Sequence, residues 1–208
     1  MCFPHSARYS PELSRASYGL GQQQTGEFDH KGLNEELYQY NTKISIPFVV
    51  SSKGYGLLFD AYSWSRWGNP NPFQQLGQVF KLYDKDGVEG ALTGTYRTAE
   101  GKTLVQREDS LAYDNERLIE NLPKLPLAGA FVKYEGEIEA PVTGDYYFTQ
   151  YYAGFQGTKI GGEEVMSRRW RPAWNPNSFR YKVHFEAGER KPVNVLWQPD
   201  GEIGRAHV

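Results

Sequence analysis

The chain has 208 residues and a formal net charge of −2, and 15% of its residues are aromatic. This length leaves room for one large domain or two small ones, and the near-neutral charge argues against a nucleic-acid partner or an anionic membrane surface. Cys2 is the sole cysteine, so no disulfide can form within the chain, and no apolar run approaches the ~18 residues of a membrane-spanning helix.

The first residues carry little structural signal. Residues 1–16 show no hydrophobic periodicity, so we expect a loose lead-in to the folded part. Residues 1–5 lack a basic stretch followed by an apolar core, so no signal peptide is expected here.

A β-hairpin is predicted within residues 44–68. Four apolar residues recur there at every second position, which places them on one face of a half-buried strand. These residues are Ile44, Ile46, Phe48 and Val50. Pro47 cannot donate a hydrogen bond to a neighbouring strand, so this strand is expected to lie at a sheet edge or to be interrupted there. Residues 51–54 supply a turn, and residues 55–59 form the return strand.

A break follows the hairpin. Residues 69–72 read Asn-Pro-Asn-Pro, and two X-Pro steps favour extended or turn backbone. We therefore divide the chain into a first domain, residues 1–74, and a second domain, residues 75–202. Residues 203–208 match nothing that we expect after the second domain, and we interpret them as a tail that is not part of the natural protein.

The second domain shows repeated short strands. Apolar residues alternate with polar ones at residues 132–138, 179–185 and 193–197, and residues 146–152 form an aromatic strand. Turns separate these segments at intervals typical of antiparallel β proteins. The chain is therefore expected to be all-β, and its second domain an antiparallel β-barrel or sandwich.

Three short blocks stand out in the first domain. They read Tyr-Gly-Leu-Gly-Gln at residues 18–22, Leu-Tyr-Gln-Tyr-Asn-Thr at residues 37–42, and Ile-Pro-Phe-Val-Val-Ser-Ser-Lys-Gly-Tyr-Gly-Leu-Leu-Phe-Asp at residues 46–60. In order and spacing they resemble the N-terminal β-sandwich of glycoside hydrolase family 31, most closely its α-xylosidase-like members, over residues 17–68. Ala61 departs from the pattern, because the resemblance leads us to expect Asn there.

The second domain carries a resemblance of its own. Its most specific block, residues 134–148, reads Tyr-Glu-Gly-Glu-Ile-Glu-Ala-Pro-Val-Thr-Gly-Asp-Tyr-Tyr-Phe, with supporting blocks at residues 92–96 and 185–197. Over residues 80–202 the sequence resembles the β-barrel domain named after anthrax protective antigen. Such a domain is known as an insert in the N-terminal sandwich of α-xylosidase-like proteins. The resemblance therefore implies a partial β-sandwich followed by an inserted antiparallel β-barrel or sandwich.

The family resemblance also implies a function for the parent protein. Family 31 enzymes are retaining α-glycosidases with two catalytic Asp residues, which lie on a (β/α)₈ barrel. This chain shows no alternation of strands and helices, so we expect no catalytic residue in it. We expect a non-catalytic N-terminal part of a periplasmic or extracellular enzyme. Its partner would be an oligosaccharide of the xyloglucan type or another α-linked glycan.

Carbohydrate contacts are the main candidate sites. Residues 167–178 are predicted to form a long loop in which Trp170 and Trp174 offer stacking rings and Arg169 offers hydrogen bonds, a mixture typical of ligand sites. Alternatively, the two rings pack on the domain and the arginines stay solvated or stack on them. The remaining candidates are Tyr152, in the segment 151–155 at the end of the aromatic strand, and Asp60 and Trp64 in the loop after the hairpin.

No metal or cofactor is expected. Some domains of the protective-antigen type bind calcium through adjacent Asp residues after the aromatic strand, but the matching residues 151–155 contain no carboxylate. The four histidines are scattered without ligand spacing.

Two other functions stay open at this point. The second domain could be a stand-alone sugar-binding module or a purely structural insert. In either case, a first domain that lacks its partner strands is expected to expose an apolar face.

Overall fold

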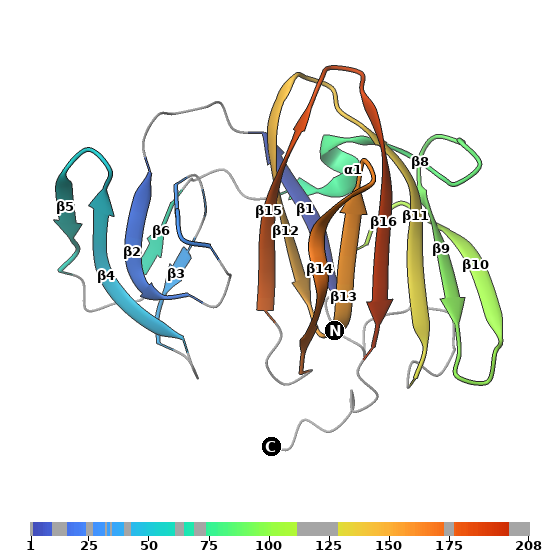
Figure 1. Ribbon diagram of the computed structural model, residues 1–208, viewed down its shortest axis with the longest axis horizontal. Helices are drawn as coiled ribbons and strands as arrows, with labels where there is room; N and C mark the ends of the chain where they lie inside the picture. The colour runs from blue at the N-terminus through green and yellow to red at the C-terminus, as the bar shows by residue number, and fades with distance from the viewer. Residues whose placement is uncertain are drawn as a thin grey trace. The chain divides into compact units, whose positions relative to one another are not determined.

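A computed structural model describes residues 2–9, 16–23, 27–31, 33, 35–39, 43–60, 65–68, 74–111, 129–172 and 177–199. The described chain is mostly β-strand (Figure 1), which confirms the all-β prediction. It divides into two compact units. The smaller unit is Ser10–Phe73, and the larger unit combines Met1–Tyr9 with Gln74–Val208.

The smaller unit contains the predicted hairpin. Strands β2 (Ser17–Gln22), β4 (Ile44–Ser51) and β5 (Tyr55–Leu58) form an antiparallel sheet in the order β2-β4-β5, and β3 (Glu35–Leu37) pairs with β6 (Ser65–Trp67). The prediction of an edge position was wrong, because β4 is the central strand. The alternative, an interruption at Pro47, is confirmed: the pairing with β2 is irregular between Gly19 and Gly21, opposite this part of β4.

The core of the smaller unit lies on the face of β4 that was not expected to be buried. Val49 packs there with Leu20 and Leu37, and the rings of Phe59 and Trp67 lie against this cluster with centroids 5.4 Å apart. The four apolar residues predicted to face the core are 40–50% exposed. The period-two pattern was therefore correct, but the assignment of the buried face was wrong.

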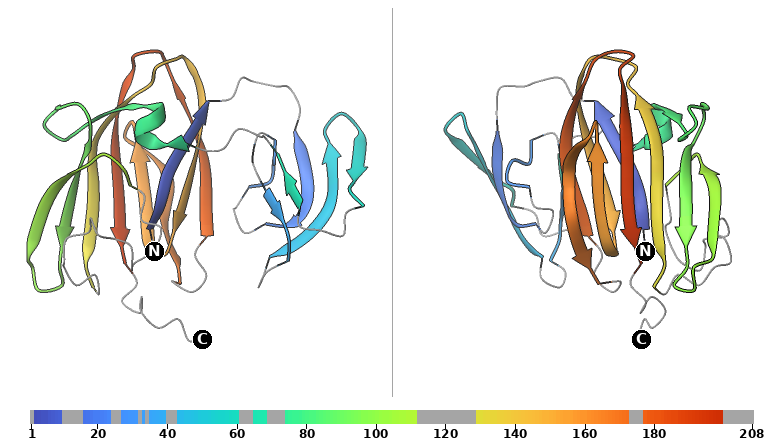
Figure 2. Two further views of the ribbon diagram at one scale, coloured as in Figure 1. Left: turned by 180° about the vertical axis from the view of Figure 1, so that it is seen from behind. Right: turned by 45° about the vertical axis from the view of Figure 1, so that its right-hand side comes forward.

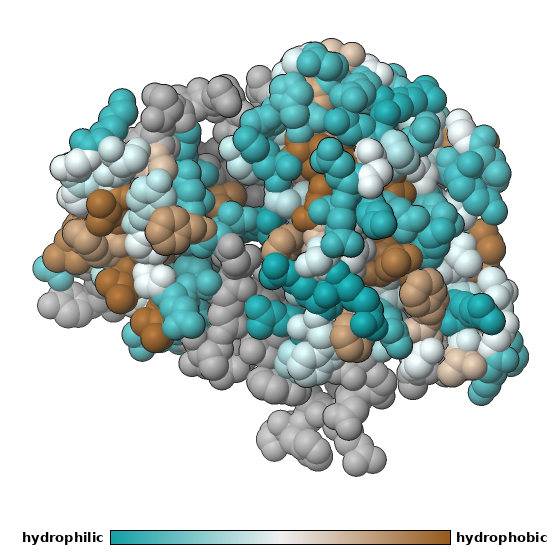
Figure 3. Space-filling model, in the orientation of Figure 1, coloured by the Kyte–Doolittle hydropathy of each residue, from teal (hydrophilic) through white to brown (hydrophobic). Residues whose placement is uncertain are grey.

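An apolar surface results, which we call the β4–β5 face. Figure 3 shows apolar side chains gathered over these two strands. Its members are Ile44, Ile46, Phe48, Val50 and Leu58, all exposed, and Leu58 lies opposite Phe48 in the pairing of the two strands. The expectation that the first domain exposes an apolar face is thus confirmed.

The larger unit has a four-stranded sheet that includes the start of the chain. Its order is β15 (Asn177–Phe185), β12 (Gly144–Tyr152), β1 (Cys2–Tyr9) and β7 (Gln74–Gln75). The pairing of β1 with β12 is antiparallel and joins Tyr9 to Tyr146 and His5 to Gln150. Residues 2–9 are therefore not a loose lead-in, and they group with the larger unit instead of with residues 10–73.

The second sheet of the larger unit has seven strands. Its path is β10 (Thr103–Glu108), β9 (Leu92–Arg97), β11 (Phe131–Glu139), β16 (Arg190–Gln198), β13 (Gly154–Ile160) and β14 (Glu163–Arg171), and β8 (Lys81–Tyr83) also pairs with β11. In Figure 2 the path can be followed from green β10 through yellow β11 to red β16. The pairings do not close into a barrel, so the sandwich is the alternative that holds.

One continuous core joins the two sheets. The short helix α1 (Leu76–Val79) leads into Phe80, whose ring lies 4.8 Å from Tyr146, 5.6 Å from Phe148 and 5.2 Å from Phe185. Trp197, on the opposite sheet, is buried and donates from Nε1 to the carbonyl of Ala153 at 2.8 Å. Large aromatic side chains account for much of the surface that is buried in such a core. Because they fill the space between the two sheets, the opposite face of each sheet points outward.

Candidate functional site

Trp170 lies on a strand and not in the predicted long loop. Strand β14 continues to Arg171, and β15 begins at Asn177. Trp174 lies outside the described residues. Neighbouring side chains on an extended strand point to opposite faces of the sheet. Arg169 and Trp170, which are neighbours on β14, therefore do not share a face.

Trp170 forms the centre of a small surface cluster. Its side chain is 49% exposed, and its ring lies 6.5 Å from that of Phe155, its partner on β13. The guanidinium of Arg168 lies 3.8 Å from the centre of the Phe155 ring, and Nη2 donates to Oε1 of Gln198 at 3.0 Å. We call these four residues (Phe155, Arg168, Trp170 and Gln198) the Trp170 platform.

The platform is suited to a ligand with both an apolar face and hydroxyl groups. The quadrupole of an aromatic ring attracts a cation that lies over its face, so the Phe155 ring and Gln198 hold Arg168 beside the exposed indole. Three of the four members were missed from sequence. The spacing of Arg168 and Trp170 at i and i+2 was the available signal, but it carries meaning only once these residues lie on a strand.

The side chain of Arg169 points to the opposite face of β14 from that of Trp170. Its guanidinium lies 4.2 Å from the centre of the Phe179 ring on β15, so it covers the edge between the two sheets. The predicted joint role of Arg169 and Trp170 in one contact therefore does not follow from this geometry.

The other predicted site residues are divided between the two units. Tyr152 ends β12 and is 2% exposed, so its ring belongs to the interior and is not open to a ligand at the surface. Asp60 is exposed in the smaller unit, just after β5. Trp64 lies outside the described residues.

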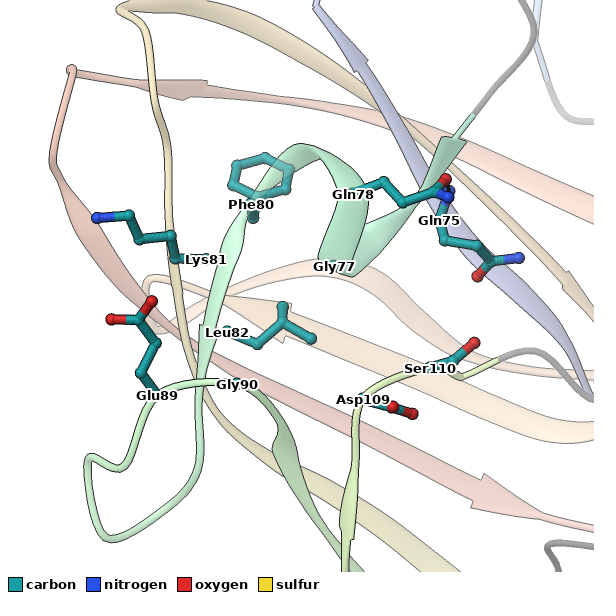
Figure 4. A pocket seen from close by; sticks show the side chains of 10 residues that line it. All are labelled: Gln75, Gly77, Gln78, Phe80, Lys81, Leu82, Glu89, Gly90, Asp109 and Ser110. Atoms are coloured by element: carbon teal, nitrogen blue, oxygen red, sulfur yellow. Dashed lines mark hydrogen bonds between the residues drawn. The ribbon is translucent and has the colours of Figure 1, made fainter.

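Two hollows occur on the described surface of the larger unit. The first, of about 490 Å³, has Lys81 and Glu89 on one side and the polar groups of Gln75, Gln78, Asp109 and Ser110 on the other (Figure 4). The second, of about 580 Å³, lies between the loop after β8 and the start of β16. Both are open, and neither set of lining residues shows a nucleophile paired with a base.

Two clusters in the larger unit combine several paired charged groups. Glu139 accepts hydrogen bonds from Tyr83 and Arg190, and these donors lower the pKa of its carboxyl to about 2. In the second cluster, a hydrogen bond from Lys182 and one with His184 lower the pKa of Asp145, and the same contact raises the pKa of His184. Such mutual neutralisation is typical of structural ion pairs and not of a poised acid or base.

Neither a cluster of metal-binding side chains nor a long apolar helix occurs in the described part. No group of three His, Cys, Asp or Glu side chains lies close enough together there to hold a metal ion. Among the same residues, no helix has the length and apolar character to cross a membrane.

Comparisons with known proteins point to one group of enzymes. The α-xylosidase of Saccharolobus solfataricus is 58% identical over 45 residues, which are 22% of this chain and 6% of that protein. An uncharacterized family 31 glucosidase of Pseudescherichia vulneris is 42% identical over 65 residues, 31% of this chain and 11% of that protein. No family model matches the chain.

A solved structure extends the similarity to nearly the whole chain. The GH31 α-xylosidase of Xanthomonas citri matches 95% of this chain with a TM-score of 0.79 and 33% sequence identity. The chain covers 22% of that structure and smaller shares of the two relatives in sequence. Sequence and fold therefore agree that the chain is α-xylosidase-like, similar to one part of a glycoside hydrolase of family 31.

Proposed function

We propose that the chain is a non-catalytic part of an α-glycosidase that acts on oligosaccharides, and that its larger unit contacts the glycan. The observation that supports this most is the likeness of nearly the whole chain to about a fifth of an α-xylosidase. In this proposal the larger unit is an insert of the protective-antigen type, the parent enzyme is periplasmic or extracellular, and its substrate is of the xyloglucan type or another α-linked glycan.

The Trp170 platform is the proposed point of contact. The exposed indole stacks on the C–H face of a pyranose, while Arg168 and Gln198 form hydrogen bonds with its hydroxyl groups. A site of this kind combines one apolar surface with a few positioned polar groups. We also propose Asp60 of the smaller unit as a contact, because the resemblance to family 31 implies a loop there that borders the sugar pocket of the parent enzyme.

The proposal is tested by titrating the chain with xyloglucan oligosaccharides in a calorimeter. We expect Trp170→Ala to weaken binding by at least about tenfold, since it removes the stacking surface. Val105→Ala, which shortens an exposed side chain on β10 of the same sheet, serves as the control and should leave binding unchanged. Absence of binding at millimolar sugar would instead favour a purely structural role for the larger unit.

The non-catalytic role has a separate test. Incubation of the chain with an aryl α-xyloside is expected to release no aglycone above the buffer rate, because the resemblance implies that the catalytic residues of the family lie on a (β/α)₈ barrel, which we do not expect in this chain. Turnover that scales with the concentration of the chain would contradict the proposal. Binding without turnover is expected both of a stand-alone sugar-binding module and of a part of an enzyme. The sequence of the parent protein would distinguish these two cases.

A further inference from the structure

The second hollow of the larger unit lies on the same sheet face as the Trp170 platform. Its floor is formed by Glu135 and Glu137 of β11 and by Asn194 of β16, and Lys159 of β13 stands at its side. Burial alternates along β13 and β16, where Thr158, Val193 and Val195 are buried, so Lys159 and Asn194 lie on the outer face. Phe155 and Lys159 therefore share the outer face of β13.

The hollow exists because β11 changes its partner strand. Residues Phe131–Glu135 pair with β9, whereas Glu137–Glu139 pair with β8. Gly136 lies at the change-over, where a Cβ atom would come within 2.0 Å of the carbonyl oxygen of Tyr83. The loop after β8 must therefore leave the sheet at this point, and it forms a wall beside β11.

That wall is fixed by its own hydrogen bonds. Oδ1 of Asp84 accepts from the backbone N–H groups of Asp86 at 3.0 Å and Val88 at 2.9 Å. The N–H of Lys85 donates to Oγ1 of Thr93 at 3.1 Å, which ties the loop to β9. A pre-formed wall loses little conformational entropy when a ligand binds.

The polar groups in the hollow suit a neutral, hydroxyl-rich ligand. Asp86 offers an acceptor, Lys159 a donor and Asn194 both. Within the described residues, the structure gives the side chains of these three no hydrogen bond or ion pair. The lining has four carboxylates (Asp84, Asp86, Glu135 and Glu137) and two lysines (Lys85 and Lys159). Asp84 is paired with Arg107 and Glu135 with Lys133, so groups of both signs remain and the hollow does not favour a simple anion.

The outer surface between the hollow and the platform runs along the paired strands β13 and β16. On paired strands β13 and β16, Phe155 lies opposite Gln198, Gly157 opposite Leu196, and Lys159 opposite Asn194. The path from Phe155 to Lys159 is ~13 Å at the rise of an extended strand. Gly157 has no side chain to obstruct it, and Leu196 offers a 39% exposed apolar surface halfway.

We propose that this hollow is a second sugar subsite, so that one oligosaccharide lies along β13 and β16 from the Trp170 platform to Asn194 and Lys159. The inference rests on the proposed function, because it assumes that the platform binds a glycan. The ligand is then a chain of several sugars, and Asn194 and Lys159 hold its far end.

The test compares oligosaccharides of increasing length on five forms of the full chain: the unchanged protein, Trp170→Ala, Asn194→Ala, Lys159→Ala and the control Val105→Ala. We expect the affinity of the unchanged protein to rise with length. Trp170→Ala should weaken binding at every length. Asn194→Ala and Lys159→Ala should each remove about two- to tenfold of affinity for long oligosaccharides only, the range for one lost hydrogen bond.

The outcomes separate the two proposals. If Trp170→Ala weakens binding but Asn194→Ala and Lys159→Ala match Val105→Ala at every length, the second subsite is overturned and the platform stands. If no oligosaccharide binds at any length, both proposals are overturned. Backbone amide shifts in NMR at Gly157 and Leu196 with long ligands alone would support the path, and melting curves verify that each variant is folded.

Discussion

At the scale of single residues, Glu139 is the group with the clearest effect on stability. Its Oε2 accepts from the Tyr83 hydroxyl at 2.8 Å and from Nε of Arg190 at 2.9 Å, and Nζ of Lys81 lies 3.2 Å from Oε1. The hydrogen bond from Tyr83 and then that from Arg190 lower the pKa of Glu139 from its ordinary value near 4.5 to about 2. The cluster connects β8, β11 and β16, because its members come from these three strands.

This pKa shift predicts a loss of stability in acid. The unfolded chain binds a proton at Glu139 near pH 4.5, whereas the folded chain does so only near pH 2. The contribution is therefore complete above about pH 4.5 and disappears as the pH falls toward 2. Urea unfolding measured across this range should show a smaller pH dependence for Glu139→Gln than for the unchanged protein.

A matched carboxylate provides the comparison. Glu163→Gln changes an exposed residue at the start of β14 to which the structure gives no ion pair. It should leave the pH dependence of unfolding as it is in the unchanged protein. Identical acid profiles for Glu139→Gln and the unchanged protein would show that the hydrogen bonds to Glu139 do not persist in solution.

At the scale of elements, β1 determines whether the four-stranded sheet is complete. It pairs with β12 on one side, and on the other side Ser6 and Ala7 pair with Gln75 and Gln74 of β7. Without β1, the backbone of β12 would become an open sheet edge, and such edges promote aggregation. The strand thus stabilises the larger unit from a distant part of the sequence.

Removal of residues 1–9 should therefore lower the melting temperature. We expect a decrease of about 5 °C or more, since a loss of 1 kcal/mol shifts the transition of a chain of this size by roughly 2–4 °C. Differential scanning calorimetry measures the shift, and removal of residues 203–208 is the control that should change it little. Equal melting of both truncated chains would contradict the role of β1.

At the scale of the whole molecule, the two units differ in the size of their cores. The core cluster of the larger unit joins both of its sheets and includes Trp197, Tyr134 and Phe148. In the described part of the smaller unit, the cluster consists of Leu20, Leu37 and Val49. The β4–β5 face adds nothing to that core, because its apolar side chains are exposed. Apolar burial provides most of the free energy of folding.

The smaller unit should accordingly open more readily. Hydrogen exchange measured by mass spectrometry should show slower exchange in β11, β13 and β16 than in β2, β4 and β5, because local stability follows buried apolar contact. The strands of each unit serve as the internal reference for the other. Similar protection in both sets would mean that the smaller unit is stabilised by contacts beyond its described core.

Sequence alone determined the all-β class, the β4–β5 hairpin and the relation to family 31, because strand period, turn residues and motif spacing are local properties. It correctly placed Val132, Tyr134 and Ile138 on one buried face of β11. It also singled out Trp170, and with it one member of the platform. The absence of catalytic residues, the assignment of the larger unit as an insert of the protective-antigen type, and the sugar contacts are still proposals.

Only the tertiary structure decided which face of each strand is covered and which strands are neighbours. A period of two shows that Ile46 and Phe48 share a face, but the partner that covers a face comes from elsewhere in the chain, so the period alone does not decide whether that face is buried. The pairing of β1 with β12 joins residues more than a hundred positions apart. For the same reason Trp170 meets Phe155 and Gln198, while Arg169 beside it turns to Phe179: the site depends on strand pairing, which sequence proximity does not encode.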